Sequence, residues 1–152
     1  MRYFLDTEFF EDGKTIELIS IAVYREDNEL FYLVNSDADF TRIEKDQWMS
    51  ANVLRHLPCT RSSAWQPKSI IKEELVKFVG DDKNPEFWAD YASYDWIVLC
   101  QLFGRMMDLP ENFPMYCNDI QQLKRELNFT GQFPVKNPHP HDASYDAKEC
   151  KD

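Results

Sequence analysis

Three strand-like segments at the N-terminus, joined by very short connections, most strongly limit the folds open to this chain. Residues 2–10, 15–24 and 30–34 are rich in aromatic and β-branched side chains, with turn-forming residues at 11–14 and 27–28 between them. Connections this short join antiparallel strands, because a parallel pair needs a crossover of about a dozen residues or more. The N-terminal segment therefore predicts a three-stranded antiparallel meander.

Helical and strand-like patterns alternate after the meander. Residues 39–57 are polar with scattered apolar positions and predict one or two helices, and residues 58–67 predict a loop. The other expected helices lie at residues 68–79, 93–103, 119–127 and from 143 onward. Short strands are expected at 85–89 and 115–117, while three prolines make 133–140 irregular. This order predicts an α/β fold, a mixed five-stranded sheet of three antiparallel strands and then two parallel ones, with helices on both faces.

Length and charge restrict the function. A chain of 152 residues is expected to form one domain, residues 1–152, with a full core. Its 17 basic and 27 acidic residues give a net charge of −10. That balance argues against broad, nonspecific duplex binding, which usually requires a basic surface. It leaves a nuclease open, because two bound Mg²⁺ ions would restore positive charge where a phosphate docks.

The four cysteines and the apolar runs indicate the compartment. None of the cysteines is in CxxC spacing, no hydrophobic leader follows Met1, and no run approaches the roughly 18 apolar residues of a membrane span. We therefore expect no membrane partner and a reduced, cytoplasmic setting. A zinc site built from His139, His141 and Cys150 is disfavoured, because the spacing of these residues is poor.

Two acidic residues interrupt the first apolar strand. Asp6 and Glu8 stand two apart, so their side chains share one face of the strand with Cα atoms roughly 6.5 Å apart. Two carboxylates at that separation can chelate a hard cation. Thr7 and Phe9 project from the other face, with backbone N–H groups expected to be available at the strand end. The alternative is an edge strand with ordinary surface charge, which the hydrophobic flanks disfavour.

A third acidic residue lies in an apolar helix. Asp95 is the only charged residue in 91–103, and we expect it in the first turn, with Ser93 as the N-cap. Its apolar neighbours favour burial, and a helix start after a strand points toward the carboxyl ends of the sheet, where α/β sites form. The alternative is a carboxylate that only stabilises the helix dipole.

A histidine and an aspartate stand five apart near the C-terminus. Asp142 can cap the last helix, which leaves His141 in the preceding loop and places Asp146 near the first turn. Ala143 and Ala147 give this helix a face of methyl groups that can press close to a sheet and bring Asp146 to the first strand. A histidine with a pKa of about 6.5 suits proton abstraction at neutral pH. The alternative is a surface histidine beside a proline.

These motifs, in this order, resemble the DEDD superfamily of 3′–5′ exonucleases, in the branch with histidine in the third motif. That branch has Asp-x-Glu, then an aspartate, then His-x-x-x-x-Asp, which match Asp6, Glu8, Asp95, His141 and Asp146. The resemblance implies a ribonuclease H-like fold. One departure is Tyr91, because many relatives have asparagine four residues before the second motif's aspartate.

Within that superfamily, the chain is most similar to the small bacterial ribonuclease AS group of polyadenylate-preferring 3′–5′ exoribonucleases. The similarity is carried by residues 2–4, 11–13, 15–21, 94–95 and 99–102, and it is poor from 37 to 82. The chain also ends six residues after Asp146, so we expect a short final helix.

The resemblance implies a two-metal mechanism with two Mg²⁺ or Mn²⁺ ions per site. Asp6 would bridge both ions, Glu8 and Asp146 would complete the inner site, Asp95 would hold the outer ion and His141 would act as general base. Thr7 and Phe9 would contact the terminal nucleotide.

The expected substrate is the 3′ end of single-stranded RNA, with adenylate preference and release of nucleoside 5′-monophosphates. A proofreading-type DNA exonuclease and a noncatalytic, Ca²⁺-holding binding module remain alternatives. The group also implies a homodimer, and Trp48 and Trp65 mark where a dimer surface or lid would lie.

Overall fold

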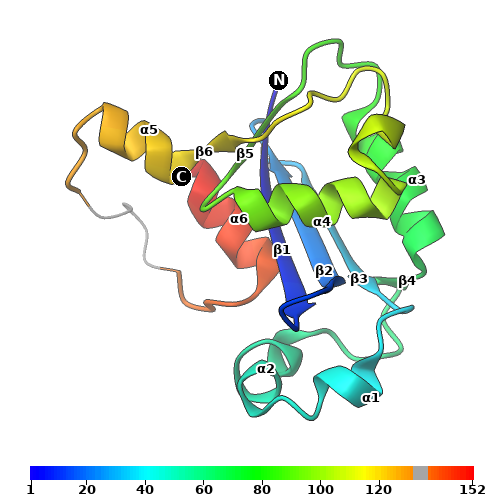
Figure 1. Ribbon diagram of the computed structural model, residues 1–152. Coiled ribbons are helices and arrows are strands. Elements are labelled where there is room, and N and C mark those ends of the chain that lie inside the picture. The colour runs from blue at the N-terminus through cyan, green and yellow to red at the C-terminus, as the bar shows by residue number, and fades with distance from the viewer. Residues whose placement is uncertain (132–136) are drawn as a thin grey trace.

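A mixed sheet of six strands organises the chain in the computed structural model, which describes residues 1–131 and 137–152 (Figure 1). The strand order is β4-β3-β2-β1-β5-β6. The antiparallel part consists of β1 (Arg2–Glu11), β2 (Ile16–Arg25) and β3 (Leu30–Asn35). The other three strands pair in parallel: β4 (Trp65–Gln66) with β3, β5 (Glu86–Ala89) with β1, and β6 (Asn118–Asp119) with β5.

The helices occupy the segments in which helical patterns were expected. They are α1 (Phe40–Ile43), α2 (Gln47–Asn52), α3 (Lys68–Val79), α4 (Ser93–Phe103), α5 (Ile120–Glu126) and α6 (Ala143–Lys151). Two 3₁₀ turns, η1 (Leu54–His56) and η2 (Met106–Asp108), complete the set within the described residues. None of these helices has the length and apolar character needed to cross a membrane.

The predicted fold class is confirmed: antiparallel strands are followed by parallel ones, with helices on both faces. The sheet has one strand more than the five expected, because Trp65–Gln66, within the predicted loop, pairs with Val34 and Asn35 of β3. The strand expected at 115–117 is wrong; it forms three residues later, where Asn118 pairs with Trp88. Of the segment expected to be irregular, 133–136 lie outside the described residues, and 137–140 contain no helix or strand.

The Ser93 N-cap is also wrong. The cap of α4 is Ala92, and no side chain of its own segment caps the helix. Instead, the Ala92 N–H donates to Asp119 Oδ2 at 2.9 Å. A residue far along the chain thus binds this helix start, which a local capping pattern cannot reveal. The Asp142 cap of α6 is confirmed, because its side chain accepts from the Ser144 N–H.

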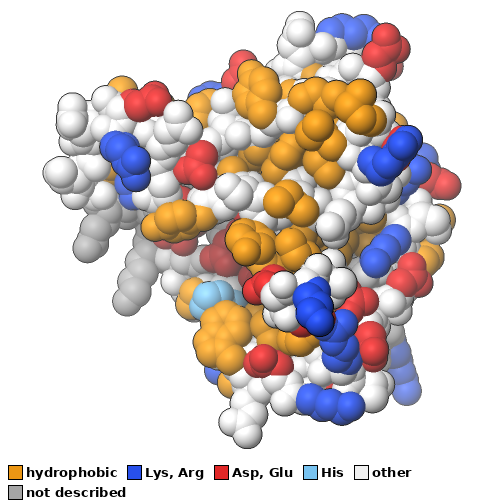
Figure 2. Space-filling view, in the orientation of Figure 1, with side chains coloured by type: hydrophobic (Ala, Val, Ile, Leu, Met, Phe, Trp, Pro, Cys, Tyr) orange, Lys and Arg blue, Asp and Glu red, His pale blue; other side chains and the backbone are white. Residues whose placement is uncertain are grey.

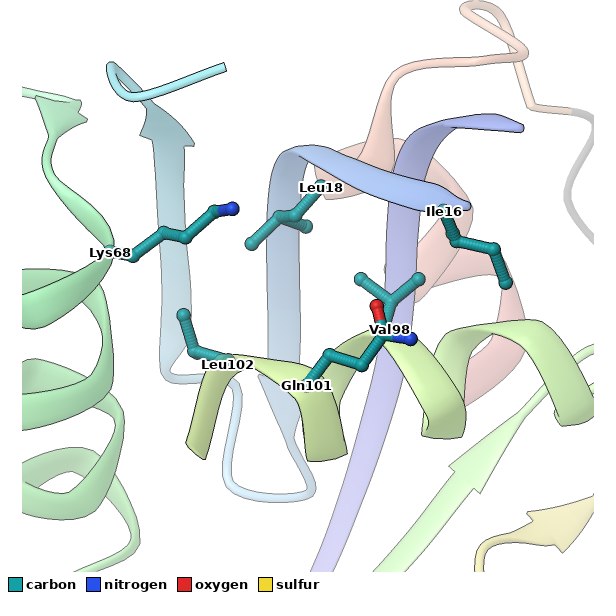
Figure 3. Close-up of a pocket in the computed structure, with 6 residues that line it drawn as sticks. All are labelled: Ile16, Leu18, Lys68, Val98, Gln101 and Leu102. Atoms are coloured by element: carbon teal, nitrogen blue, oxygen red, sulfur yellow. The ribbon is translucent and has the colours of Figure 1, made fainter. Parts of the chain in front are cut away.

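The two faces of the sheet are covered differently. On one face, α3 and α4 pack over the main core, in which Leu5, Ile21, Leu75, Phe87 and Leu99 are fully buried. Figure 1 shows α4 crossing the strands, with α1 and α2 gathered at one end of the sheet. The gap between α3, α4 and β2 is only about 30 Å³, room for one or two waters; its lining is drawn in Figure 3. This side of the sheet is therefore packing surface.

The opposite face carries α6 at close range. Ala22 of β2 and Ala143 and Ala147 of α6 form a buried cluster, all at most 1% exposed. Methyl-only contacts allow the helix and sheet backbones to approach closely. The predicted methyl face of this helix is therefore confirmed, and it places the N-terminal turn of α6 against β1 and β2.

Candidate active site

The first two site residues lie on the α6 side of β1. Alternation along the strand directs Asp6 and Glu8 to that side, while Tyr3 and Leu5 enter the main core. The β1–β2 register shifts between Glu8 and Phe9, leaving Ile19 of β2 as an extra residue. Bulges of this kind bend a strand and re-aim its side chains, and they are common beside active sites.

Asp146 meets these two carboxylates from α6. One oxygen from each of Asp6, Glu8 and Asp146 lies within 4.8 Å of the others. The contact follows from the alanine face of α6, which brings the first turn of the helix onto β1. Two segments 138 residues apart thus form one carboxylate group. Among the described residues this is the only such group of potential ligands, and His139 and Cys150 are not part of it.

Asp146 is oriented from the loop before α6. Its Oδ2 accepts the His141 backbone N–H at 2.9 Å. Its Oδ1 accepts the Asn137 side-chain amide. Asn137 was not among the residues singled out from the sequence; its only signal was its position in the proline-rich segment before His141.

Asp95 reaches the same region from the opposite face. The β1–β5 pairing covers Arg2 to Phe4, so the two strands separate before Asp6, and the start of α4 lies at this opening. Asp95, in the first turn of α4 as predicted, is only 7% exposed. Its Oδ1 accepts the Thr7 N–H at 2.8 Å and the Thr7 hydroxyl at 2.7 Å. The expectation that the Thr7 N–H would be available is therefore not met.

His141 is exposed at the mouth of the site. Its backbone is left-handed, with φ of 67°, and its ring meets the edge of Trp48 on α2 with centroids 5.0 Å apart. This contact limits the directions available to an exposed imidazole. It also links α2 to the histidine motif.

All seven residues singled out from the sequence line one cleft of about 400 Å³: Asp6, Thr7, Glu8, Phe9, Asp95, His141 and Asp146. The remaining lining residues are Trp48, Asp90, Tyr91 and Tyr94. Phe9 stacks on Tyr94, with ring centroids 5.5 Å apart and planes within 6°. Figure 2 shows acidic atoms recessed in a hollow between hydrophobic side chains, with a histidine at its rim. The cleft therefore combines a carboxylate floor with aromatic walls.

Sequence reasoning did not assign the four remaining lining residues to the site. Asp90 lies between a strand and a turn, where an acidic residue is common and therefore gives no signal. Trp48 was noted only as a place where a dimer surface or lid would lie. Tyr91 was noted only as a departure from the asparagine of many relatives.

Burial and mutual repulsion raise the pKa values of the carboxylates. Desolvation, followed by the charges of Asp95 and Asp146, holds the pKa of Asp6 well above its ordinary value. Desolvation and Asp146 raise the pKa of Glu8 to about 8. Desolvation also raises the pKa values of Asp95 and Asp146 to about 6, although hydrogen bonds from Thr7 and His141 partly offset it. Several buried carboxylates thus repel one another.

A divalent cation would relieve this repulsion. Oxygen donors within 4.8 Å of each other suit a hard cation such as Mg²⁺ or Mn²⁺, and the donor set contains no thiolate or imidazole that would favour zinc. The residues present therefore fit the metal that the motif pattern implies.

Comparison with known proteins places the chain in a family. The model of the 3′-5′ exoribonuclease Rv2179c-like domain matches residues 1–152. The chain belongs to this family. Two relatives from Mycobacterium tuberculosis, 3′-5′ exoribonuclease Rv2179c of strain ATCC 25618 / H37Rv and 3′-5′ exoribonuclease MT2234.1 of strain CDC 1551 / Oshkosh, are each 38% identical over 151 residues. The alignment covers 98% of this chain and 88% of each relative.

Proposed function

We propose that this protein is a divalent-metal-dependent 3′–5′ exoribonuclease of the histidine-containing DEDD type, within the ribonuclease AS group. It removes nucleoside 5′-monophosphates from the 3′ ends of single-stranded RNA, with a preference for adenylate. One observation carries the proposal: carboxylates from two distant segments converge in a cleft that also holds Asp95 and His141. The names of its family and of its relatives support the same activity.

In this proposal, the carboxylates hold two Mg²⁺ or Mn²⁺ ions. Asp6, Glu8 and Asp146 would hold the inner ion, and Asp6 and Asp95 would hold the outer one. When bound, the ions neutralise charge on the scissile phosphate and lower the pKa of the attacking water. Hydrogen bonds from Asn137 and His141 fix the Asp146 carboxylate, so its side chain need not rearrange when an ion binds.

His141 takes the proton from the attacking water. An exposed imidazole can exchange that proton with solvent after each turnover, and the Trp48 contact keeps the ring at the cleft. No other histidine lines the cleft within the described part of the chain.

Thr7 and Phe9 are proposed to contact the terminal nucleotide. Because the Thr7 N–H and hydroxyl both bind Asp95, we assign Thr7 the task of fixing that carboxylate beneath the nucleotide. Phe9, stacked on Tyr94 in the cleft wall, offers an aromatic surface to the last base.

The test is digestion of 5′-labelled oligomers of adenylate RNA, uridylate RNA and adenylate DNA, each with Mg²⁺, with Mn²⁺ and with EDTA. We expect stepwise shortening from the 3′ end and release of AMP, fastest on adenylate RNA and absent in EDTA. Asp6→Asn should abolish the reaction, whereas Asp81→Asn, an exposed acid outside the cleft, should not. Faster digestion of DNA would indicate a proofreading-type enzyme, and binding without cleavage would indicate a noncatalytic module.

Two finer expectations accompany the proposal. We propose a cytoplasmic location, for which the four free cysteines are suited.

We also propose a homodimer, which light scattering of the purified protein tests directly: the mass of one chain would contradict it.

A further inference from the structure

Tyr91 has a backbone conformation that its side chain disfavours. The φ angle of Tyr91 is +52°, in the left-handed region, and the residue is 71% exposed. For a bulky residue this conformation is an outlier, whereas glycine and asparagine adopt it more readily. Such strain persists only where surrounding contacts fix it, and it is concentrated at binding and catalytic sites.

The contacts that fix Tyr91 come from the start of α5. On one side of Tyr91, the Gln121 side-chain amide donates to Asp90 Oδ1 at 2.7 Å. On the other, the Ala92 N–H donates to Asp119 Oδ2 at 2.9 Å. Both flanking residues are thus tied to another element, while the tyrosine ring is left largely in solvent at the cleft. Packing does not explain the position of this ring.

The composition of the cleft indicates what the ring could bind. Within the described part of the chain, the cleft lining contains carboxylates and aromatic rings but no lysine or arginine. Proteins usually gain most of their nucleic-acid affinity from cationic contacts to phosphates. That source is missing from these walls, and aromatic stacking on bases is the other general source of affinity for a single strand.

We propose that Tyr91 is a base-binding residue, whose exposed ring stacks on a nucleobase of the strand entering the cleft. This inference rests on the proposed function, because it takes single-stranded RNA as the substrate. The strained turn holds the ring at the cleft before the substrate arrives. Tyr91 thereby determines affinity for the strand and takes no part in proton transfer.

Tyr91→Asn tests the inference through two readouts, because the affinity for the strand should fall while the stability of the fold should rise. Removing the ring should raise KM for an adenylate oligomer about 5- to 150-fold, the range for one lost stacking contact. Relief of strain should raise the melting temperature by about 1–4 °C. Tyr91→Phe should retain most of the affinity because it keeps the aromatic face. Tyr116→Asn removes a similarly exposed ring outside the cleft and should leave KM unchanged.

A binding measurement separates this inference from the proposed function. Fluorescence anisotropy of a labelled adenylate oligomer, with Ca²⁺ in place of the catalytic metal, gives Kd without turnover. If the wild-type protein released no nucleotide, the proposed function would fail, but a weakened Kd in Tyr91→Asn would still support the stacking role. Unchanged Kd and KM in Tyr91→Asn would overturn the inference, as would equal loss in Tyr91→Phe and Tyr91→Asn.

Discussion

Asp6, Glu8, Asp95 and Asp146 are placed so that each makes ionisation of another harder. The raised pKa values come first from burial and then from neighbouring charge. Buried carboxylates that retain protons near neutral pH are typical of sites that hold cations or move protons. The cost of assembling them without metal is therefore expected to appear in the stability of the protein.

The metal-free protein should lose stability as pH rises. Burial raises the pKa of Glu8 from its ordinary value of 4.5 to about 8, and it raises the pKa values of Asp95 and Asp146 from 3.8 to about 6. Groups with raised pKa values bind more protons folded than unfolded, so their contribution is complete below about pH 4 and is lost as pH rises through about 6 and then about 8. Melting curves in EDTA should show a falling melting temperature across this window.

Two controls accompany this measurement. Saturating Mn²⁺ should raise the melting temperature most at the upper end of the window, because ligands must be deprotonated to bind. Glu8→Gln should flatten the decline above about pH 6, since it removes the group with a pKa of about 8. A melting temperature in EDTA that increased with pH would contradict the crowded-carboxylate description.

The histidine assignment gives a second prediction. His141→Ala should reduce turnover about 10²- to 10⁴-fold, the usual effect of losing a general base, with Mn²⁺ binding retained. His139→Ala is the matched control: this exposed histidine packs against Tyr145 and lies outside the cleft lining. Initial rates on adenylate RNA measure both. Wild-type turnover in His141→Ala would show that another group accepts the proton.

At the scale of elements, the position of α6 determines whether the carboxylate group forms. Its alanines allow the helix to lie directly on β1 and β2. Asp146, in the first turn of the helix, is thereby brought to Asp6 and Glu8. The same helix begins at the Asp142 cap, immediately after His141. One short element therefore positions both residues of the third motif.

Ala147→Leu should displace this helix. Ala147 is fully buried against β2, so a larger side chain cannot be accommodated without movement. We expect a destabilisation of about 1–3 kcal/mol by thermal unfolding. Weaker Mn²⁺ binding by calorimetry should accompany it, because Asp146 moves away from Asp6. Lys148→Leu makes the same kind of change on the exposed side of α6 and should leave Mn²⁺ affinity intact; an equal loss in both variants would contradict the argument.

Local patterns predicted most elements but not the contacts between distant ones. The meander, α3 and α6 follow from periodicity, turns and caps that lie within a few residues of one another. Strand β4 was missed because its two residues form a strand only by pairing with β3. The cap of α4 was missed because Asp119 supplies it from another element.

The same division holds for the site. Asp6, Glu8 and Asp95 were identifiable because acids in apolar segments are unusual, and His141 and Asp146 by their spacing around the start of a helix. The structure places all five in one cleft. Their individual roles remain predictions. Asn137, Trp48 and Asp90 gave no comparable signal, because each acquires its place only when the chain folds.

At the scale of the whole molecule, charge separates this protein from most nucleic-acid binders. The net charge is −10, and the cleft lining within the described residues has no lysine or arginine. Under the proposed function, affinity for the RNA would then come from bound metal ions and from bases stacked on aromatic rings, both of which act at short range.

Because lysine and arginine are absent from the described cleft lining, we expect KM to depend only weakly on salt concentration. KM for an adenylate oligomer should rise less than about threefold between about 50 and 200 mM salt. The reason is that side-chain cations are expected to make, on average, less than about one contact to a phosphate. Initial rates at fixed Mn²⁺ across that range measure it. A rise of tenfold or more would show that basic residues outside the cleft bind the strand.

The proposed activity requires that residues distant in sequence meet around a pair of cations. Its most direct test is a crystal structure with Mn²⁺ and AMP, with the ions located by anomalous scattering. We expect one ion among Asp6, Glu8 and Asp146, a second between Asp6 and Asp95, and the nucleotide phosphate beside His141. Mn²⁺ bound elsewhere, or a nucleotide away from this cleft, would contradict it.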